Sequence, residues 1–163
     1  MREYVMWPDK RLKTAAAEVA AITDEVRAIW DEMIFAMDTM PGVGLAAVQL
    51  GVMQRLAVVD ASDVRGQAVR MANPEILHSS AQLRTHEEGS PNLPGVWAKI
   101  ERPRAVTVRF LNASGDVEER DFVGVWATSV QHQVDHLNGK MFFDHLSKVK
   151  RDMLLKKATK VRV

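Results

Sequence analysis

Residues 23–40 carry apolar side chains at every third or fourth position, which is the spacing of one face of an α-helix. Thr23 or Asp24 can cap the start of this helix, and Pro41-Gly42 is expected to end it. Large apolar side chains on such a face predict core packing rather than a cofactor site. The buried face would consist of Val26, Ile29, Trp30, Met33, Ile34 and Met37.

Alternating apolar and polar residues predict strands further along the chain. Residues 55–60 (RLAVVD) form one expected strand, and residues 66–77 (GQAVRMANPEIL) a second one that stops at Pro74. Residues 105–123 predict a hairpin, because an Asn-Ala-Ser-Gly-Asp turn separates two alternating runs. The strands therefore come in hairpins rather than alternating with helices.

Residues 124–139 (GVWATSVQHQVDHLNG) are apolar on nearly every side, which predicts a buried helix closed by Asn138-Gly139. Residues 147–161 predict a short C-terminal helix. Together these elements favour an α+β fold, with antiparallel sheets around one central helix and a further helix toward each end of the chain. The length of 163 residues fits a single domain spanning 1–163.

The composition excludes some classes of protein and of site. No apolar run approaches the roughly 20 residues of a membrane-spanning helix, so no membrane contact is expected. The first residues lack the pattern of a signal peptide, and a cytoplasmic location is expected. The chain has no cysteine, which excludes disulfides and thiolate metal sites.

The net charge of +1 hides an uneven distribution. Residues 147–163 contain seven basic residues and one acidic residue, Asp152, which leaves a net charge of −5 on residues 1–146. A basic tail on an acidic body can contact nucleic acid or another anionic surface. The alternative is an ordinary solvated helix face.

The stretch QHQVDHL, residues 131–137, places His132 and His136 four residues apart. On a helix that spacing puts both imidazoles on one face, where they can bind one metal ion. In hydrolytic sites of this kind a glutamate follows the first histidine and moves the proton, but this chain has Gln133. Alternatively, the two buried imidazoles are satisfied by Gln133, Ser90 or a water, and no metal is needed.

Three stretches together resemble, in order, the motifs GxGLAAxQ, EGCLS and QHExDHLxG of the peptide deformylases. They are residues 42–51 (GVGLAAVQLG), 87–97 (EEGSPNLPGVW) and 131–139 (QHQVDHLNG). The resemblance covers nearly the whole chain. It implies a mixed α+β fold with the HxxxH helix at its centre, wrapped by antiparallel sheets.

The resemblance also implies a reaction and its residues. In that family two histidines and the cysteine of EGCLS hold iron, zinc or nickel, and the enzyme releases formate from N-terminal formyl-methionine. His132 and His136 match the imidazole ligands, Gln49 matches the amide that holds the oxyanion, and Glu88 matches a structural carboxylate. With Glu88, the residues expected to contact substrate are Val43, Gly44, Leu45, Val125 and Ser129.

Three positions depart from the family motifs. Ser90 stands where the cysteine ligand is expected, and a neutral hydroxyl is a poor ligand for zinc or ferrous iron. Gln133 stands at the glutamate position, and loss of general acid–base help costs about 10²–10⁴-fold. Pro91 has no N–H to offer an oxyanion, a loss typically worth about 10²–10³-fold. His86 shares the face of Ser90 in an extended segment, but at about 13 Å it is too distant to replace the cysteine.

These departures predict a peptide deformylase-like protein without the usual metal-dependent activity, holding no metal or a weakly bound one at His132 and His136. It would retain binding to peptide N-termini, or to ribosomal RNA through its basic tail, with salt-dependent affinity. The alternative is an active metal-dependent deformylase or amidase with a changed ligand set or substrate. A third hypothesis is a subunit or regulator of an active paralogue. The candidate RNA contacts are Lys148, Lys150, Arg151, Lys156 and Lys157.

Thr128 and Ser129 open a further question about the pocket, because the family places apolar residues or cysteine there. Their hydroxyls would make a pocket more polar and less suited to methionine. Alternatively, the hydroxyls bond back to helix carbonyls and leave the pocket unchanged.

Overall fold

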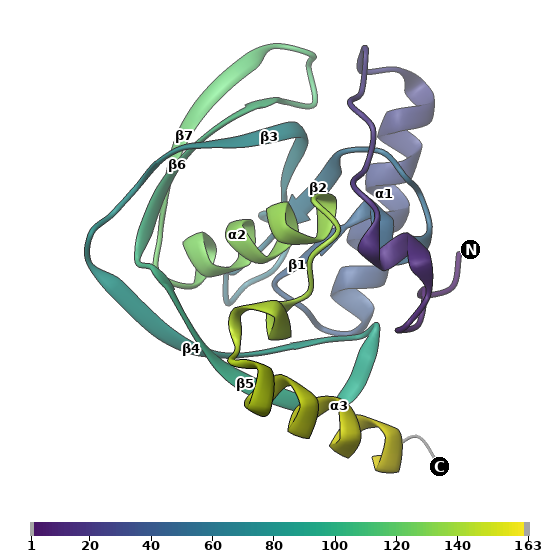
Figure 1. The fold of residues 1–163 in the computed structure, drawn as a ribbon. Coiled ribbons are helices and arrows are strands. Elements are labelled where there is room, and N and C mark those ends of the chain that lie inside the picture. Colours follow the sequence, from purple (N-terminus) through teal and green to yellow (C-terminus); the bar gives the residue numbers. More distant parts are fainter. Residues whose placement is uncertain (1, 162–163) are drawn as a thin grey trace.

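The computed structural model describes residues 2–161, and positions 162 and 163 of the predicted basic tail lie outside it. Two antiparallel sheets surround the central helix α2, as Figure 1 shows. This arrangement confirms the predicted α+β fold. The helices are α1 (Asp24–Thr39), α2 (Val125–Leu137) and α3 (Lys148–Val161). The strands are β1 (Gly44–Ala46), β2 (Leu56–Val59), β3 (Val69–Ser79), β4 (Leu83–Ser90), β5 (Leu93–Pro103), β6 (Ala105–Leu111) and β7 (Val117–Val123).

The larger sheet has the strand order β1-β2-β3-β6-β7, and β4 and β5 form the second sheet as a long hairpin. Every strand pair in both sheets is antiparallel. The predicted hairpin of residues 105–123 is confirmed as β6 and β7. Strand β4 continues to Ser90, and only Pro91 and Asn92 separate it from β5.

Helix α1 begins where its sequence predicts. The Thr23 hydroxyl accepts a hydrogen bond from the backbone N–H of Val26 at 3.2 Å, which satisfies one of the free donors of the first turn. The apolar face packs against β1 and β2, and Trp30 donates from its indole N–H to the Met71 carbonyl at 3.2 Å. Most of the predicted face is therefore core.

Strand β3 differs from its prediction, because it does not stop at Pro74 but continues to Ser79. The pairing register with β6 shifts between Ala72 and Glu75, so the proline lies at an irregularity where no ladder hydrogen bond is lost. Asn73 adopts a positive φ of 51° there, and its side chain bonds both the N–H and the carbonyl of Val19. The tertiary contact between Asn73 and Val19 thus stabilises the chain next to Pro74, where the strand continues.

Helix α2 is buried, as predicted. Leu137, His136 and most residues before them are buried, and Asn138 and Gly139 close the helix. Gly139 has φ 77°, and a Cβ there would lie 2.8 Å from the Lys13 backbone, so only glycine fits. Burial of this helix places both histidines inside the protein.

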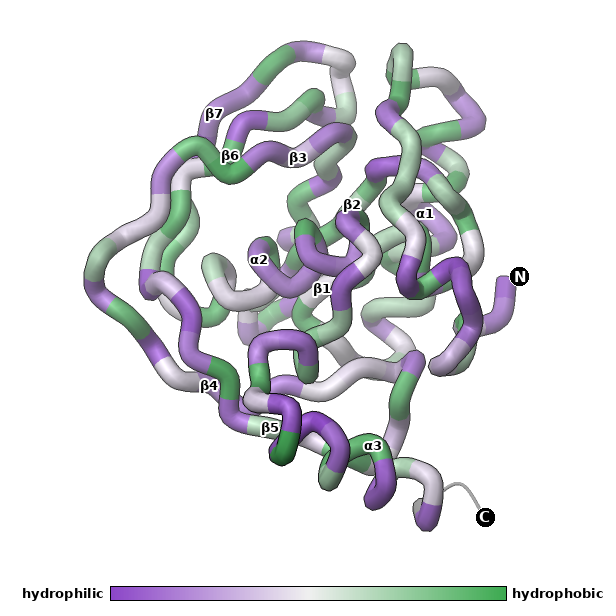
Figure 2. The backbone as a smooth tube through the Cα atoms, in the orientation of Figure 1, coloured by the Kyte–Doolittle hydropathy of each residue, from purple (hydrophilic) through white to green (hydrophobic). Residues whose placement is uncertain are grey.

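Helix α3 packs against β5 through Leu154 and Ala158, while its lysines face solvent. Figure 2 shows hydrophilic positions along much of this helix. Within residues 2–161, no helix is long and apolar enough to cross a membrane.

Candidate active site

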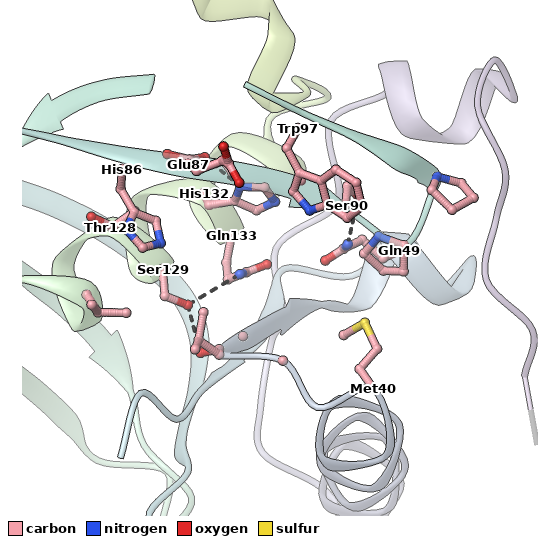
Figure 3. Close-up of a pocket in the computed structure, with 18 of the residues that line it drawn as sticks. Met40, Gln49, His86, Glu87, Ser90, Trp97, Thr128, Ser129, His132 and Gln133 are labelled. Carbon is pink, nitrogen blue, oxygen red and sulfur yellow. Dashed lines mark hydrogen bonds and ion pairs between the residues drawn. The ribbon is translucent and has the colours of Figure 1, made fainter. Parts of the chain in front are cut away.

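A cavity of about 670 Å³ lies between α2, β4, the β4–β5 turn and the segment that leads into β1. Figure 3 shows His86 and Thr128 toward one end, Gln49 and Ser90 toward the other, and His132 and Gln133 between them. The structure thus brings three distant sequence stretches to one place. The sequence-predicted site residues that line the cavity are Val43, Gly44, Gln49, Glu88, Ser90, Pro91, Val125, Ser129, His132 and Gln133.

Two predicted site residues lie elsewhere. The Leu45 side chain is fully buried in the core beside α1, because neighbouring residues of a strand point to opposite faces. It therefore does not line the cavity, contrary to its assignment as a substrate contact. His136 is also fully buried and reaches the cavity only through its contact with His132.

The two imidazoles face each other through their Nε2 atoms, which lie 3.1 Å apart. Two nitrogens bound to one tetrahedral ion at about 2.0–2.1 Å would lie about 3.3 Å apart, so the pair fits a shared metal. Burial lowers the pKa of His136 well below its ordinary value of 6.5, and repulsion from His132 lowers it further. His136 is therefore neutral at pH 7, which is the form that binds metals.

Glu88 orients the first histidine. Its Oε1 lies 2.9 Å from Nδ1 of His132, so this nitrogen donates to the carboxylate and Nε2 is left as a ligand. Arg102 donates to both oxygens of Glu88, at 2.7 and 3.0 Å, and to Asp135 at 2.9 Å. Burial would raise the pKa of Glu88, but hydrogen bonds from His132 and Arg102 outweigh it and the pKa is lowered. Glu88 is thus a charged, fixed support.

Asn92 is a site residue that was not expected from the sequence, because the motif comparison of residues 87–97 pointed only to Glu88, Ser90 and Pro91. It is fully buried, and its Oδ1 accepts hydrogen bonds from Gln49 Nε2 at 2.7 Å and from the Ser90 hydroxyl at 3.0 Å. Its Nδ2 donates to the carbonyls of Val5 and Gln49. Asn92 therefore fixes the amide of Gln49 next to Ser90.

Gln133 and Gly44 meet in a tight contact at the floor of the cavity. A Cβ on Gly44 would lie 2.3 Å from the Ser129 hydroxyl and 2.5 Å from Gln133 Nε2, so glycine is required. Ser129 donates to the Val43 carbonyl at 2.8 Å, and Gln133 donates to Ser129 at 3.5 Å. The buried Oε1 of Gln133 has no partner among residues 2–161.

The hydroxyls of Thr128 and Ser129 do not bond back to carbonyls of their own helix in the described part of the chain. Ser129 bonds the Val43 carbonyl, as above, and Thr128 accepts from Arg84 Nη1 at 3.0 Å. Both side chains line the cavity and add polar groups to it.

The donor set fits a metal through its two imidazoles. Ser90 lines the same cavity, and its hydroxyl donates to Asn92. Within residues 2–161 no group of three or more His, Cys, Asp or Glu residues is arranged to hold an ion. His86 does not complete the set, because β4 is extended from Leu83 to Ser90 and keeps it four residues away from Ser90.

Comparison with known proteins gives a consistent result. The family model for polypeptide deformylase matches residues 1–152. Peptide deformylase of Afipia carboxidovorans is 44% identical over 98% of this chain and 95% of its own length. Peptide deformylase of Rhodopseudomonas palustris strain TIE-1 is 40% identical over 98% and 94%.

Solved structures agree with the sequence comparison. Peptide deformylase from Ehrlichia chaffeensis has a TM-score of 0.92 at 32% identity and covers 99% of this chain and 97% of its own. A peptide deformylase from Legionella pneumophila has a TM-score of 0.92 at 35% identity, with 99% and 95% covered.

These relatives correct one prediction. The departures at Ser90, Pro91 and Gln133 predicted a protein without the usual deformylase activity, but relatives 40–44% identical over nearly the whole chain are named peptide deformylase. The geometry agrees with the correction, because the imidazole pair, its Glu88 support and the cavity are all present despite Ser90, Pro91 and Gln133. The earlier alternative, an active enzyme with a changed ligand set or substrate, is the better interpretation.

Proposed function

Because this chain belongs to the polypeptide deformylase family, we propose that it hydrolyses the formyl amide at peptide N-termini with an altered metal-ligand and proton-transfer set. Its products would be formate and a free amino terminus. Nascent chains carry such formyl groups, so the cytoplasm is the proposed location.

The observation that carries this proposal is the imidazole pair. His132 and His136 would hold a divalent ion such as iron, zinc or nickel through their Nε2 atoms, and Glu88 keeps His132 in the correct tautomer. The ion, when bound, supplies Lewis-acid polarisation of the formyl carbonyl and activation of a water.

The remaining residues bind and orient. Gln49 Nε2 donates one N–H to Asn92. Its second N–H makes a longer contact of 3.4 Å with the Ser90 hydroxyl, and it can donate to the formyl oxygen instead. The unpartnered Oε1 of Gln133 can accept a hydrogen bond from the attacking water and orient it. Its amide cannot take the proton, which passes to solvent instead, so the rate is expected to fall about 10²–10⁴-fold below that of a glutamate enzyme.

Formate release from a formyl-Met peptide tests the proposal. The protein is loaded without oxygen with ferrous iron, nickel or zinc in turn. We expect slow, metal-dependent turnover that His136→Ala abolishes, while the exposed His78→Ala on β3 leaves it unchanged. No turnover above the His136→Ala background with any metal, on any formyl peptide, would refute it.

We also propose that the exposed basic face of α3 contacts ribosomal RNA. Lys150, Lys156 and Lys157 are exposed, whereas Leu154 and Ala158 hold the helix on β5. Replacing Lys156 and Lys157 by Gln removes charge without touching the packing. Ribosome binding should weaken in this variant and with added salt. Salt-independent binding, or equal binding of the variant, would contradict this role.

A further inference from the structure

Two side-chain contacts, spaced four residues apart on both elements, join strand β4 to helix α2. Arg84, His86 and Glu88 alternate with exposed residues of β4 and so share the face toward α2. Glu88 contacts His132, and four residues earlier on both elements Arg84 donates to Thr128. Thr128 therefore lies one helical turn, about 6 Å, from the metal-binding histidine.

This end of the cavity offers hydrogen-bond donors from His86 and Thr128, and Arg84 is bonded to Thr128. Arg84 forms no ion pair with any carboxylate in residues 2–161, and half-buried His86 has no hydrogen bond there. The nearby carboxylate of Glu88 is already held by Arg102 and His132. Glu87 is exposed and also lines the cavity, so its charge opposes an acidic ligand there, although water and salt screen an exposed charge.

We propose that this end, lined by His86 and Thr128 with Arg84 bonded to Thr128, binds the side chain of the first substrate residue and prefers a carboxylate to the thioether of methionine. The inference rests on the proposed function, since it places the formyl group beside His132 and Gln49. His86 and Thr128 then lie in the direction of the following side chain (Figure 3).

The physical reason is that donors left without acceptors in a cavity cost binding free energy. An acidic side chain accepts from the Thr128 hydroxyl, which Arg84 polarises, and from His86, while Arg84 lowers the energy of its charge. Methionine supplies no comparable acceptor and leaves these groups unpaired. A charge-assisted contact of this kind changes affinity about tenfold or more.

Binding and turnover of three tripeptides test the inference: formyl-Glu-Ala-Ser, formyl-Gln-Ala-Ser and formyl-Met-Ala-Ser. Calorimetry on the metal-free protein measures affinity without any reaction. We expect the Glu peptide to bind about tenfold more tightly than the Met peptide, with Gln between them, and the gap to shrink in high salt. His86→Leu and Arg84→Met should each reduce or reverse the preference, and Arg84→Lys should keep part of it.

Arg104→Met is the matched control, because Arg104 is exposed and its side chain bonds only Gln82 among the described residues 2–161. It should leave the preference unchanged. Equal affinity for the Glu and Met peptides, or tighter binding of Met, would overturn the inference, as would a Glu preference that Arg84→Met and His86→Leu leave intact.

Formate release, measured separately on the metal-loaded protein, distinguishes the two proposals. Turnover with a Met preference would support the proposed function and overturn this inference. A Glu preference in binding without turnover of any formyl peptide would support the inference about the cavity and overturn the proposed function.

Discussion

Nε2 of His132 lies 3.1 Å from Nε2 of His136, at the buried side of the cavity. Glu88 fixes the first ring, and full burial keeps the second ring neutral. The pair is thus oriented for an ion by its surroundings, even though Ser90 supplies no thiolate.

Ser90→Cys should strengthen metal binding. A thiolate is a soft anionic ligand, whereas a hydroxyl stays neutral at pH 7, so the variant should retain zinc or nickel through dialysis that strips the original protein. Metal content after dialysis against a weak chelator measures this. The Ser114→Cys variant on the exposed β6–β7 turn controls for adventitious thiol binding. Equal metal loss from both variants would rule out Ser90 as a ligand position.

Gln133→Glu should raise kcat by about 10²–10⁴-fold, because a carboxylate can take the proton that the amide cannot. The two side chains have nearly the same shape, so the contact with Gly44 should tolerate the change. Steady-state formate release at saturating metal gives the ratio. An unchanged kcat would mean that proton transfer does not limit the reaction.

Asn92→Ala should lower the free energy of unfolding by about 2–4 kcal/mol, because the buried amide of Gln49 and the carbonyl of Val5 lose their hydrogen-bond partner. Asn92→Asp keeps the shape but loses both N–H donors, so it should also destabilise the protein. Urea unfolding measures both changes. Wild-type stability in the two variants would mean that this network contributes nothing.

Glu88 should make the free energy of unfolding depend on pH in the acidic range. Its pKa is lowered from 4.5 in the folded state, so its contribution is present above pH 4.5 and is lost as the pH falls through the lowered value. The stability difference between wild type and Glu88→Gln should therefore shrink in acid. Urea unfolding from pH 7 to pH 3 checks this, with exposed Glu119→Gln as the control. A difference that stays constant across that range would contradict the assignment.

Local patterns were sufficient for several elements. The spacing of Val26, Ile29 and Met33 predicted α1, and the apolar run around His132 predicted a buried helix. They failed at Pro74, where the side chain of Asn73 bonds Val19, a residue 54 positions away, and carries β3 onward. A contact over that separation leaves no periodic signal in the sequence.

By itself the sequence determined the α+β class, the histidine spacing and the departures at Ser90, Pro91 and Gln133, because periodicity and residue chemistry are local properties. The tertiary structure alone decided that Asn92 holds Gln49, that Leu45 is core, and that His86 and Thr128 form the polar end of the cavity, with Arg84 bonded to Thr128. Each of these depends on how segments far apart in the sequence pack together. That packing is decided by burial of the whole chain and not by any one segment.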